Sequence, residues 1–294
     1  MELDLRQEIN CQMALWLPGK IPFDEVYQLA AEMGGMGYIS SAECDIMRNS
    51  CLVNLHMIHN AALAGVKSYF FSSSACVYPN QDLDAEESEE HDAYPAFPHN
   101  EYGWEKLFSE RVLQAYGRKY PMRVRIARFQ NTYGPESHWI GGREKAPAAM
   151  CRKVAECPNG GKIEVWGGGG AVRAYTYISD TIDGIRALMN AESCMHGFGW
   201  VDLGKTSVDI GRREYVTVDE LAKTVIEISG KNVGIVHVPG PEGVANRRFR
   251  AAIAAAIGWE SKVSLHDGLK LTYDWVSLQV AAQQVFHGMK AIHT

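Results

Sequence analysis

The chain has 294 residues, of which 46% are hydrophobic and 22% are charged. These fractions are close to the averages for globular proteins, and the length suits one large α/β unit with a smaller appended lobe. A formal net charge of −6 gives no basic footprint of the kind that binds nucleic acid. No apolar run approaches the ~20 residues that a membrane-spanning helix needs. Composition therefore predicts neither a nucleic-acid nor a membrane partner.

The seven cysteines are scattered and include no Cys-x-x-Cys pair. An odd number of cysteines without paired spacing indicates free thiols in a reducing compartment, and argues against disulfides or a zinc site. The early acidic residues Glu2, Asp4 and Glu8 argue against a secretory signal peptide. The ten histidines show no convincing metal-ligand spacing. We therefore expect a cytoplasmic protein without a metal site.

Strand-like runs alternate with helical periodicity in the first half of the chain. In chain order, the sequence predicts a strand over 26–30, a helix over 46–64, a strand over 66–71, a helix over 102–116 and a strand over 123–128. This alternation predicts right-handed βαβ crossovers and a doubly wound parallel sheet. The acidic, Pro-rich segment 80–100 is predicted to be a surface loop beside any site on that sheet.

The pattern loosens beyond Asn131, where glycine-containing turns separate short elements. This part suits a smaller lobe, with further strands of the sheet predicted at 175–178 and 200–203. Residues 217–220, Thr-Val-Asp-Glu, form a capping box that predicts a helix to about residue 229. Another helix is predicted from about residue 251 to Gly258.

The most informative motif is residues 72–79, SSSACVYP, together with Tyr102 and Lys106. The serines follow a predicted buried strand, and ligands bind at the carboxyl ends of strands in open α/β sheets. Tyr102 and Lys106 are four residues apart, so they share a helix face, and a nearby ammonium favours the phenolate. A tyrosine in this state can remove a proton from an alcohol. The alternative is a Ser-rich turn beside a chance Tyr-x-x-x-Lys, with Cys76 as an inert buried thiol.

Residues 141–153 place four basic side chains around the predicted start of a helix: Arg143, Lys145, Arg152 and Lys153. They form either a phosphate cradle or a solvated charged face. Arg173 and Arg247 each follow a glycine-rich stretch and have the geometry for bidentate phosphate contacts. Gly34 and its neighbours in 34–37, GGMG, allow close approach of backbone to a ligand but do not form a dinucleotide fingerprint.

Five blocks in this order resemble the extended short-chain dehydrogenase/reductases that act on nucleotide sugars, and within them the GDP-mannose 3,5-epimerase family. The blocks are 30–37 (AAEMGGMG), 73–79 (SSACVYP), 128–135 (RFQNTYGP), 142–149 (GREKAPAA) and 239–244 (PGPEGV). The resemblance implies an α/β protein with a Rossmann-like doubly wound parallel sheet that lacks its first strands. It implies a partial NAD-binding domain over 1–132, whose sheet also receives 175–204, and a nucleotide-sugar lobe over 133–294.

The resemblance implies NAD-dependent epimerisation of GDP-mannose to GDP-L-galactose and GDP-L-gulose through a 4-keto intermediate. Tyr102, supported by Lys106 and Ser74, takes the C4 hydroxyl proton. Cys76 and Lys145 match the family's general base and acid. Asp4, Tyr102 and Lys106 would contact NAD. The nucleotide sugar would be held by Gly34, Ser74, Ala75, Cys76, Asn131, Glu144, Lys145, Ala146, Lys153, Ala171, Val172, Arg173 and Arg247.

Other readings of the same residues stay open. The chain could be a catalytically impaired paralogue that binds a nucleotide sugar or pairs with a full-length epimerase, since the family's Gly-rich fingerprint would lie before Met1. A GDP-fucose-synthase-like enzyme is a second alternative, although that group has histidine where Lys145 stands here. Another nucleotide-sugar epimerase or dehydratase is a third. A homodimer is implied by the resemblance alone.

Overall fold

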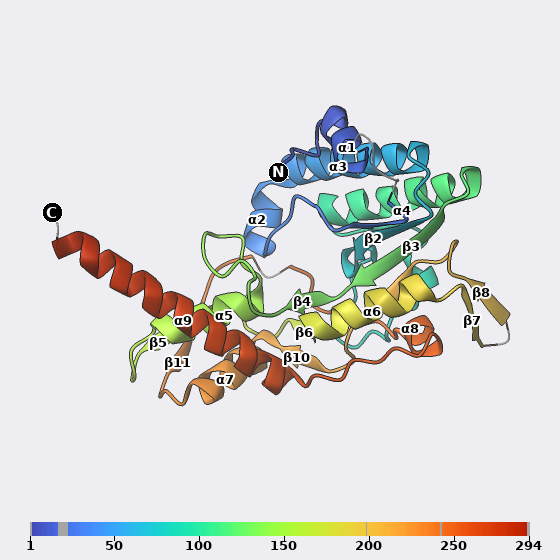
Figure 1. The fold of residues 1–294 in the computed structure, drawn as a ribbon. Coiled ribbons are helices and arrows are strands. Elements are labelled where there is room, and N and C mark those ends of the chain that lie inside the picture. The colour runs from blue at the N-terminus through green and yellow to red at the C-terminus, as the bar shows by residue number, and fades with distance from the viewer. Residues whose placement is uncertain (1, 17–22, 198, 242, 293–294) are drawn as a thin grey trace.

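The computed structural model describes residues 2–16, 23–197, 199–241 and 243–292 (Figure 1). A four-stranded parallel sheet of order β1-β2-β3-β9 forms its first lobe. Ser74 pairs with Phe129, and Phe129 with Ile210, so three strands end at the same edge. The strands are β1 (Glu25–Gln28), β2 (Ser68–Ser74), β3 (Arg123–Phe129) and β9 (Val208–Ile210).

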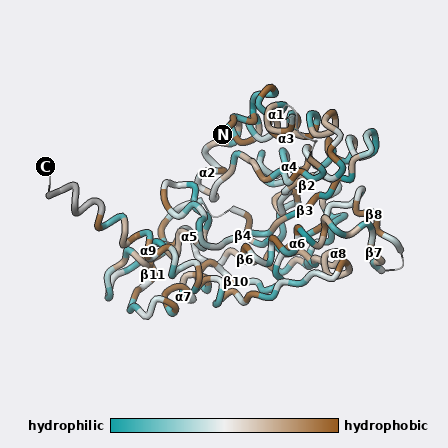
Figure 2. The backbone as a smooth tube through the Cα atoms, viewed as in Figure 1, coloured by the Kyte–Doolittle hydropathy of each residue, from teal (hydrophilic) through white to brown (hydrophobic). Residues whose placement is uncertain are grey.

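Helices cover both faces of this sheet. α3 (Glu43–Leu63) and α4 (Glu101–Lys119) lie side by side on one face with α1 (Glu8–Leu15) against α3, and α6 (Ile178–Asn190) covers the other (Figure 1). Tyr69, Phe70 and Phe71 are almost fully buried, as a parallel strand covered on both sides requires. Figure 2 shows stretches of hydrophobic residues along the chain in this layer between the helices.

The second lobe has its own core. Leu221, Val225, Leu269 and Val276 are fully buried in it. Its strands form a sheet of order β10-β6-β4 and a parallel pair β11-β5. The bounds are β4 (Asn131–Tyr133), α5 (Ala146–Glu156), β5 (Lys162–Trp166), β6 (Val172–Tyr177), β10 (Tyr215–Thr217), α7 (Val218–Ser229), β11 (Gly234–Val238) and α9 (Leu265–Ile292).

Most elements predicted from periodicity are confirmed, with β2 extending through the serines to Ser74. The capping box is confirmed too. Thr217 Oγ1 accepts from the Glu220 amide at 3.1 Å, and Glu220 Oε2 accepts from the Thr217 amide at 2.7 Å. Gly230, at a φ of 67°, ends α7 in the left-handed conformation that glycine tolerates. The helix predicted near residue 251 is α8 (Ala252–Ala256).

The prediction that residues 175–204 return to the first sheet is wrong. β6 pairs with β4 and β10, whereas β8 (Gly199–Asp202) pairs with β7 (Ser193–His196) in an antiparallel hairpin. The returning strand is β9, whose three residues are all buried, while β8 is mostly exposed. A strand added to a sheet covered on both faces is expected to be buried on both sides, and β9 meets that condition whereas β8 does not.

The segment 80–100 is irregular except for the short helix η2 (Glu90–Ala93), and it forms β-bridges to Asn246 and Phe249 of the second lobe. No helix in the described part of the chain combines the length and apolarity needed to cross a membrane. The same part of the chain contains no group of three or more side chains placed to hold a metal ion.

Candidate active site

A cavity of about 360 Å³ opens at the carboxyl ends of β2 and β3. Every residue predicted to bind the nucleotide sugar lines it except Val172, and Tyr102 lines it as well. Lys106 lies behind Tyr102 and is 1% exposed. The structure therefore brings residues from both lobes to one site, as the sequence blocks predicted.

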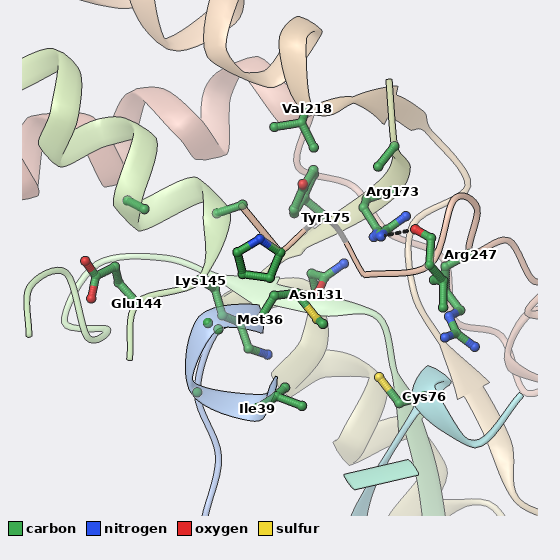
Figure 3. Close-up of a pocket in the computed structure, with 18 of the residues that line it drawn as sticks. Met36, Ile39, Cys76, Asn131, Glu144, Lys145, Arg173, Tyr175, Val218 and Arg247 are labelled. Atoms are coloured by element: carbon green, nitrogen blue, oxygen red, sulfur yellow. Dashed lines mark hydrogen bonds between the residues drawn. The ribbon is translucent and has the colours of Figure 1, made fainter. Parts of the chain in front are cut away.

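The turn that carries Cys76 is fixed on both sides. It is the short helix η1 (Ala75–Val77), which directly follows β2. Ser74 Oγ accepts a hydrogen bond from the Cys76 amide at 3.1 Å. Arg247 Nη1 donates to the carbonyls of Ala75 and Tyr78, each at 2.9 Å. The flanking side chains are buried and Cys76 is partly exposed, so its thiol faces the cavity (Figure 3).

Helix α4 brings Tyr102 and Lys106 against this turn. Asn100 caps the helix by accepting from the Gly103 amide at 3.0 Å. A Cβ atom at Gly103 would lie 2.2 Å from the carbonyl oxygen of Cys76, so a glycine is required for this close approach. Lys106 Nζ donates to the Ser72 carbonyl at 2.9 Å and lies 5.7 Å from the centroid of the Tyr102 ring.

Burial dominates the electrostatics of Tyr102. Burial raises the pKa of the phenol, the nearby Cys76 adds to the rise, and a hydrogen bond with Ser74 opposes it. Burial also lowers the pKa of Lys106, against the pull of Glu105. Desolvation of the enclosed phenol is the largest cause of the raised pKa, and the favourable effect of Lys106 on the phenolate stays a prediction.

Lys145 approaches the cavity from the side opposite Cys76 (Figure 3). It is the N-cap of α5, whose first turn contains Pro147, and it follows Gly141 and Gly142, both at positive φ. Burial lowers the pKa of the Lys145 ammonium, and Cys76 opposes that shift. A lysine with a lowered pKa can exchange protons closer to neutrality than an exposed one.

Positive charge gathers around Cys76. Burial lowers the pKa of four cationic side chains near Cys76, and a Cys76 thiolate would partly offset that shift. These side chains are Lys106, Lys145, Arg173 and Arg247. Lys153 also lines the cavity and donates to the Glu164 carbonyl at 2.6 Å. The cavity wall is therefore complementary to a negatively charged ligand.

The two predicted phosphate-binding arginines are engaged with backbone. Arg173 Nη1 donates to the Val172 carbonyl at 2.7 Å, and Nη2 donates to the Val244 carbonyl. Arg247 holds the Cys76 turn. Glu144 lines the cavity, but its carboxylate points away from Cys76 (Figure 3) and accepts from Arg152 Nη2 at 3.0 Å. Asn131 Nδ2 donates to the Ala174 carbonyl at 3.2 Å.

An apolar wall of the cavity was not predicted. Its residues come from five separate segments: Met36 and Ile39, Trp166, Tyr175, Val218 and Pro241. Trp166 stands directly before the glycine run 167–170, which is the one sequence signal that marks it. Met36 and Pro241 lie in the sequence blocks 30–37 and 239–244, whereas Ile39, Tyr175 and Val218 carry no pattern that separates them from ordinary core residues.

A second cavity, of about 320 Å³, lies beyond the carboxyl end of β1 and is lined by Asp4, Ala30, Ala31 and Glu32 among others. Asp4 accepts from Arg6 Nε and Nη2, each at 2.8 Å. Small alanines allow a flat ring to approach the strand end, and a carboxylate can accept hydroxyl donors of a ribose. Of the three residues predicted to contact NAD, Asp4 lines this second cavity, Tyr102 lines the first, and Lys106 is buried behind Tyr102, so polar groups of the kind that a dinucleotide needs are present at both cavities.

The model of a protein family described as the NAD dependent epimerase/dehydratase family matches residues 2–197. The chain belongs to this family. A GDP-mannose 3,5-epimerase of Arabidopsis thaliana is 37% identical over 286 residues, which are 96% of this chain and 71% of that protein. GDP-mannose 3,5-epimerase 1 of Oryza sativa subsp. indica is 36% identical over 285 residues, with the same coverage. The resemblance carried by the five sequence blocks is thus confirmed.

More distant relatives agree. GDP-L-fucose synthase 1 of Arabidopsis thaliana is 28% identical over 84% of this chain and 74% of that protein. A UDP-glucose 4-epimerase of Thermotoga maritima, solved with UDP-glucose, superposes with a TM-score of 0.80 at 24% identity, over 95% of this chain and 84% of that one. The enzyme of the same name from Thermus thermophilus, solved with NAD, gives 0.77 at 22% identity, over 93% and 83%. These structures establish the Rossmann-like epimerase fold, and the family is NAD-dependent.

Proposed function

We propose that this enzyme catalyses the 3,5-epimerisation of GDP-mannose, giving GDP-L-galactose and GDP-L-gulose. The observation that carries the proposal is the placement of Cys76 and Lys145 on opposite sides of one cavity, beside Tyr102. Relatives that bear this activity in their names are 36–37% identical over 96% of the chain. Inversion at carbon needs two titratable groups on opposite faces of a sugar ring, and this pair meets that requirement.

The reaction begins at C4 of the hexose. NAD, when bound by Asp4, Tyr102 and Lys106, supplies the reversible oxidation of that carbon. Tyr102 takes the hydroxyl proton as the ketone forms and returns it at the end. The hydrogen bond between Ser74 and Tyr102 favours the phenolate against burial, so Ser74 both orients and tunes this base.

A ketone at C4 makes the C–H bonds at C3 and C5 acidic, because the resulting carbanion is delocalised as an enolate. Cys76 removes a proton from one face and Lys145 returns one to the other. The lowered pKa of Lys145 makes its ammonium a better acid at neutral pH than an exposed lysine. Repetition at the second carbon gives the doubly inverted product.

The diphosphate of the substrate is matched by the basic wall of the cavity. Lys153, Arg173 and Arg247 line it, and the two arginines lie near enough to Cys76 to interact with it electrostatically. The apolar wall around Trp166 and Tyr175 offers flat surfaces against which a nucleobase can stack. Charge on one side and aromatic surface on the other suit a nucleoside diphosphate sugar.

A comparison of substrates tests this proposal. We would incubate the chain and NAD⁺ with GDP-mannose or with UDP-glucose and identify the products by chromatography and proton NMR. Conversion of GDP-mannose alone, to C5 and C3,C5 epimers, supports the proposal. Conversion of UDP-glucose alone would indicate another nucleotide-sugar epimerase, and NADPH-dependent reduction of a 4-keto sugar would indicate a fucose-synthase-like enzyme. Tight binding without turnover would support the impaired paralogue.

We also propose that the enzyme is a cytoplasmic homodimer formed through α3 and α4. Four large apolar side chains on these adjacent helices remain 37–46% exposed: Met47, Leu55, Trp104 and Phe108. An apolar surface of this kind on a soluble fold indicates a protein interface. Light scattering on the parent and on Phe108→Glu tests the dimer, since a charge at the centre of the interface should give a monomer.

A further inference from the structure

A cluster of side chains joins the two lobes beside the cavity that contains Cys76, and one member of it, Glu32, lines the second cavity. Arg143 Nη2 donates to the Tyr38 hydroxyl at 2.8 Å and lies 2.9 Å from Glu32 Oε1. The Tyr38 hydroxyl donates to the same Glu32 oxygen at 2.5 Å. The Arg143 guanidinium carbon also lies 4.1 Å from the centroid of the Tyr38 ring, within cation–π distance. We call Glu32, Tyr38 and Arg143 the clasp.

The backbone beneath the clasp makes an unusually close contact. The Gly35 amide donates to the Arg143 carbonyl at 3.1 Å. A Cβ atom at Gly35 would lie only 2.3 Å from the carbonyl oxygen of Glu144. Gly35 has an ordinary negative φ of −71°, so glycine is required here for the approach and not for the backbone conformation.

This contact bears directly on Lys145. Lys145 is the N-cap residue of α5, so the helix holds the backbone only on the C-terminal side of Lys145. On the other side, Gly141 and Gly142 are conformationally permissive residues at φ values of 99° and 86°. The clasp and the Gly35 contact therefore support the backbone on that side, together with the ion pair of Glu144 with Arg152 at 3.0 Å.

We propose that Gly35 and the clasp are positioning elements that hold Lys145 across the cavity from Cys76. The inference rests on the proposed role of Lys145 in proton transfer. Tyr38 and Arg143 do not line the cavity. They act through the 143–145 backbone and contact no reacting atom.

Two kinds of measurement test this inference with three variants, Gly35→Ala, Arg143→Ala and Tyr38→Phe. The control is Arg213→Ala, which removes an arginine of a surface ion pair with Glu87 remote from Lys145. Hydrogen–deuterium exchange of the free chain should show amides 141–146 exchanging at least about 10-fold faster in the variants, because local opening becomes easier. This readout needs neither NAD nor substrate.

Steady-state kinetics provide the second readout. Displacement of a catalytic group by about 1 Å can cost about 100-fold in rate, so kcat for GDP-mannose should fall about 10- to 100-fold. KM should change less than about threefold, because no variant except Gly35→Ala alters the cavity wall. Oxidation at C4, followed as NADH formation in a single turnover, should persist, because Tyr102 and Lys106 are unaffected.

The outcomes separate this inference from the proposed function. Suppose that the unmodified enzyme converts GDP-mannose and that Arg143→Ala and Tyr38→Phe match the Arg213→Ala control in both measurements. This result would overturn the positioning role and leave the proposed function standing. A parent that fails to convert GDP-mannose would remove the proposed function and this inference with it. Should Gly35→Ala not fold, the other two variants decide, because both alter partly exposed side chains.

Discussion

The hydroxyl of Tyr78 lies 2.7 Å from each carboxylate oxygen of Asp209, and Asp209 is fully buried. Tyr78 ends the turn that carries Cys76, whereas Asp209 is the middle residue of β9. Arg128 Nη1 donates to the same hydroxyl at 3.1 Å. The fourth strand of the sheet thus supports the turn that carries Cys76.

Asp209 should make stability fall as pH rises. Burial, with a smaller effect of Glu90, raises its pKa well above the usual value of about 3.9. The folded state therefore binds a proton that the unfolded state has released, so this group's contribution is complete below about pH 4 and is lost as pH rises through the folded-state pKa. Asp209→Asn keeps an acceptor for Tyr78 and removes the titration. Calorimetry from pH 4 to about 8 should show the stability of Asp209→Asn rising relative to that of the unmodified enzyme as pH increases. Parallel stability curves for the two proteins would contradict the raised pKa of Asp209.

Glu110 and Arg128 form a buried ion pair, 1% and 3% exposed, with bonds of 2.9 and 2.7 Å. Glu110→Gln leaves Arg128 without its counter-charge and should lower the free energy of unfolding by about 3–5 kcal/mol. The matched change Glu87→Gln, in the partly exposed pair with Arg213, should cost no more than about 1 kcal/mol. Urea unfolding measures both. Equal effects of the two substitutions would show that burial does not decide the strength of these pairs.

Arg247 should protect the Cys76 turn. Arg247→Ala removes the donor to two buried carbonyls, those of Ala75 and Tyr78, and should lower the free energy of unfolding by about 2–4 kcal/mol. Alkylation of Cys76, followed on its own peptide by mass spectrometry, should become faster as the turn loosens. An unchanged alkylation rate in a folded variant would mean that Ser74 and β2 suffice to hold the turn.

Tyr102 is the proton acceptor at C4 in the proposed reaction. Tyr102→Phe should lower kcat about 10²- to 10⁴-fold, the usual range for loss of a general base. Affinity for GDP-mannose, measured by calorimetry, should stay within about threefold because the ring and the cavity shape remain. Activity within about twofold of the parent would require a different base.

Sequence periodicity predicted the elements whose apolar residues are long and regular, from β1 to β3 and their two helices. It missed β9 because three residues with a carboxylate at the centre, Val208, Asp209 and Ile210, give no strand pattern. The motif blocks contain Cys76 and Lys145, the spacing to Lys106 marked Tyr102, and the fold places all three at the site described above. Helical spacing gave the proximity of Lys106 to Tyr102 but not the burial that raises the pKa of the phenol.

The support of Lys145 could not be read from the sequence either. Gly35 and Arg143 are 108 positions apart, and only the fold brings the glycine against the carbonyl of Glu144. The sequence allowed the basic cluster 143–153 to be either a phosphate-binding site or a solvated charged face. In the structure some of its side chains line the cavity and others lie at the surface. Lys145 and Lys153 face the cavity, whereas Arg143 is 43% exposed and pairs with Glu32.

Proton exchange at the sugar ring tests the central claim most directly. We would incubate the enzyme with GDP-mannose and NAD⁺ in deuterated water and locate deuterium by mass spectrometry and proton NMR, with Cys76→Ala and Lys145→Ala as controls. We expect deuterium at C3 and C5 with the parent and at neither carbon with the variants. Absence of deuterium with a parent that binds both NAD⁺ and GDP-mannose by calorimetry would contradict the assignment of this enzyme as a 3,5-epimerase.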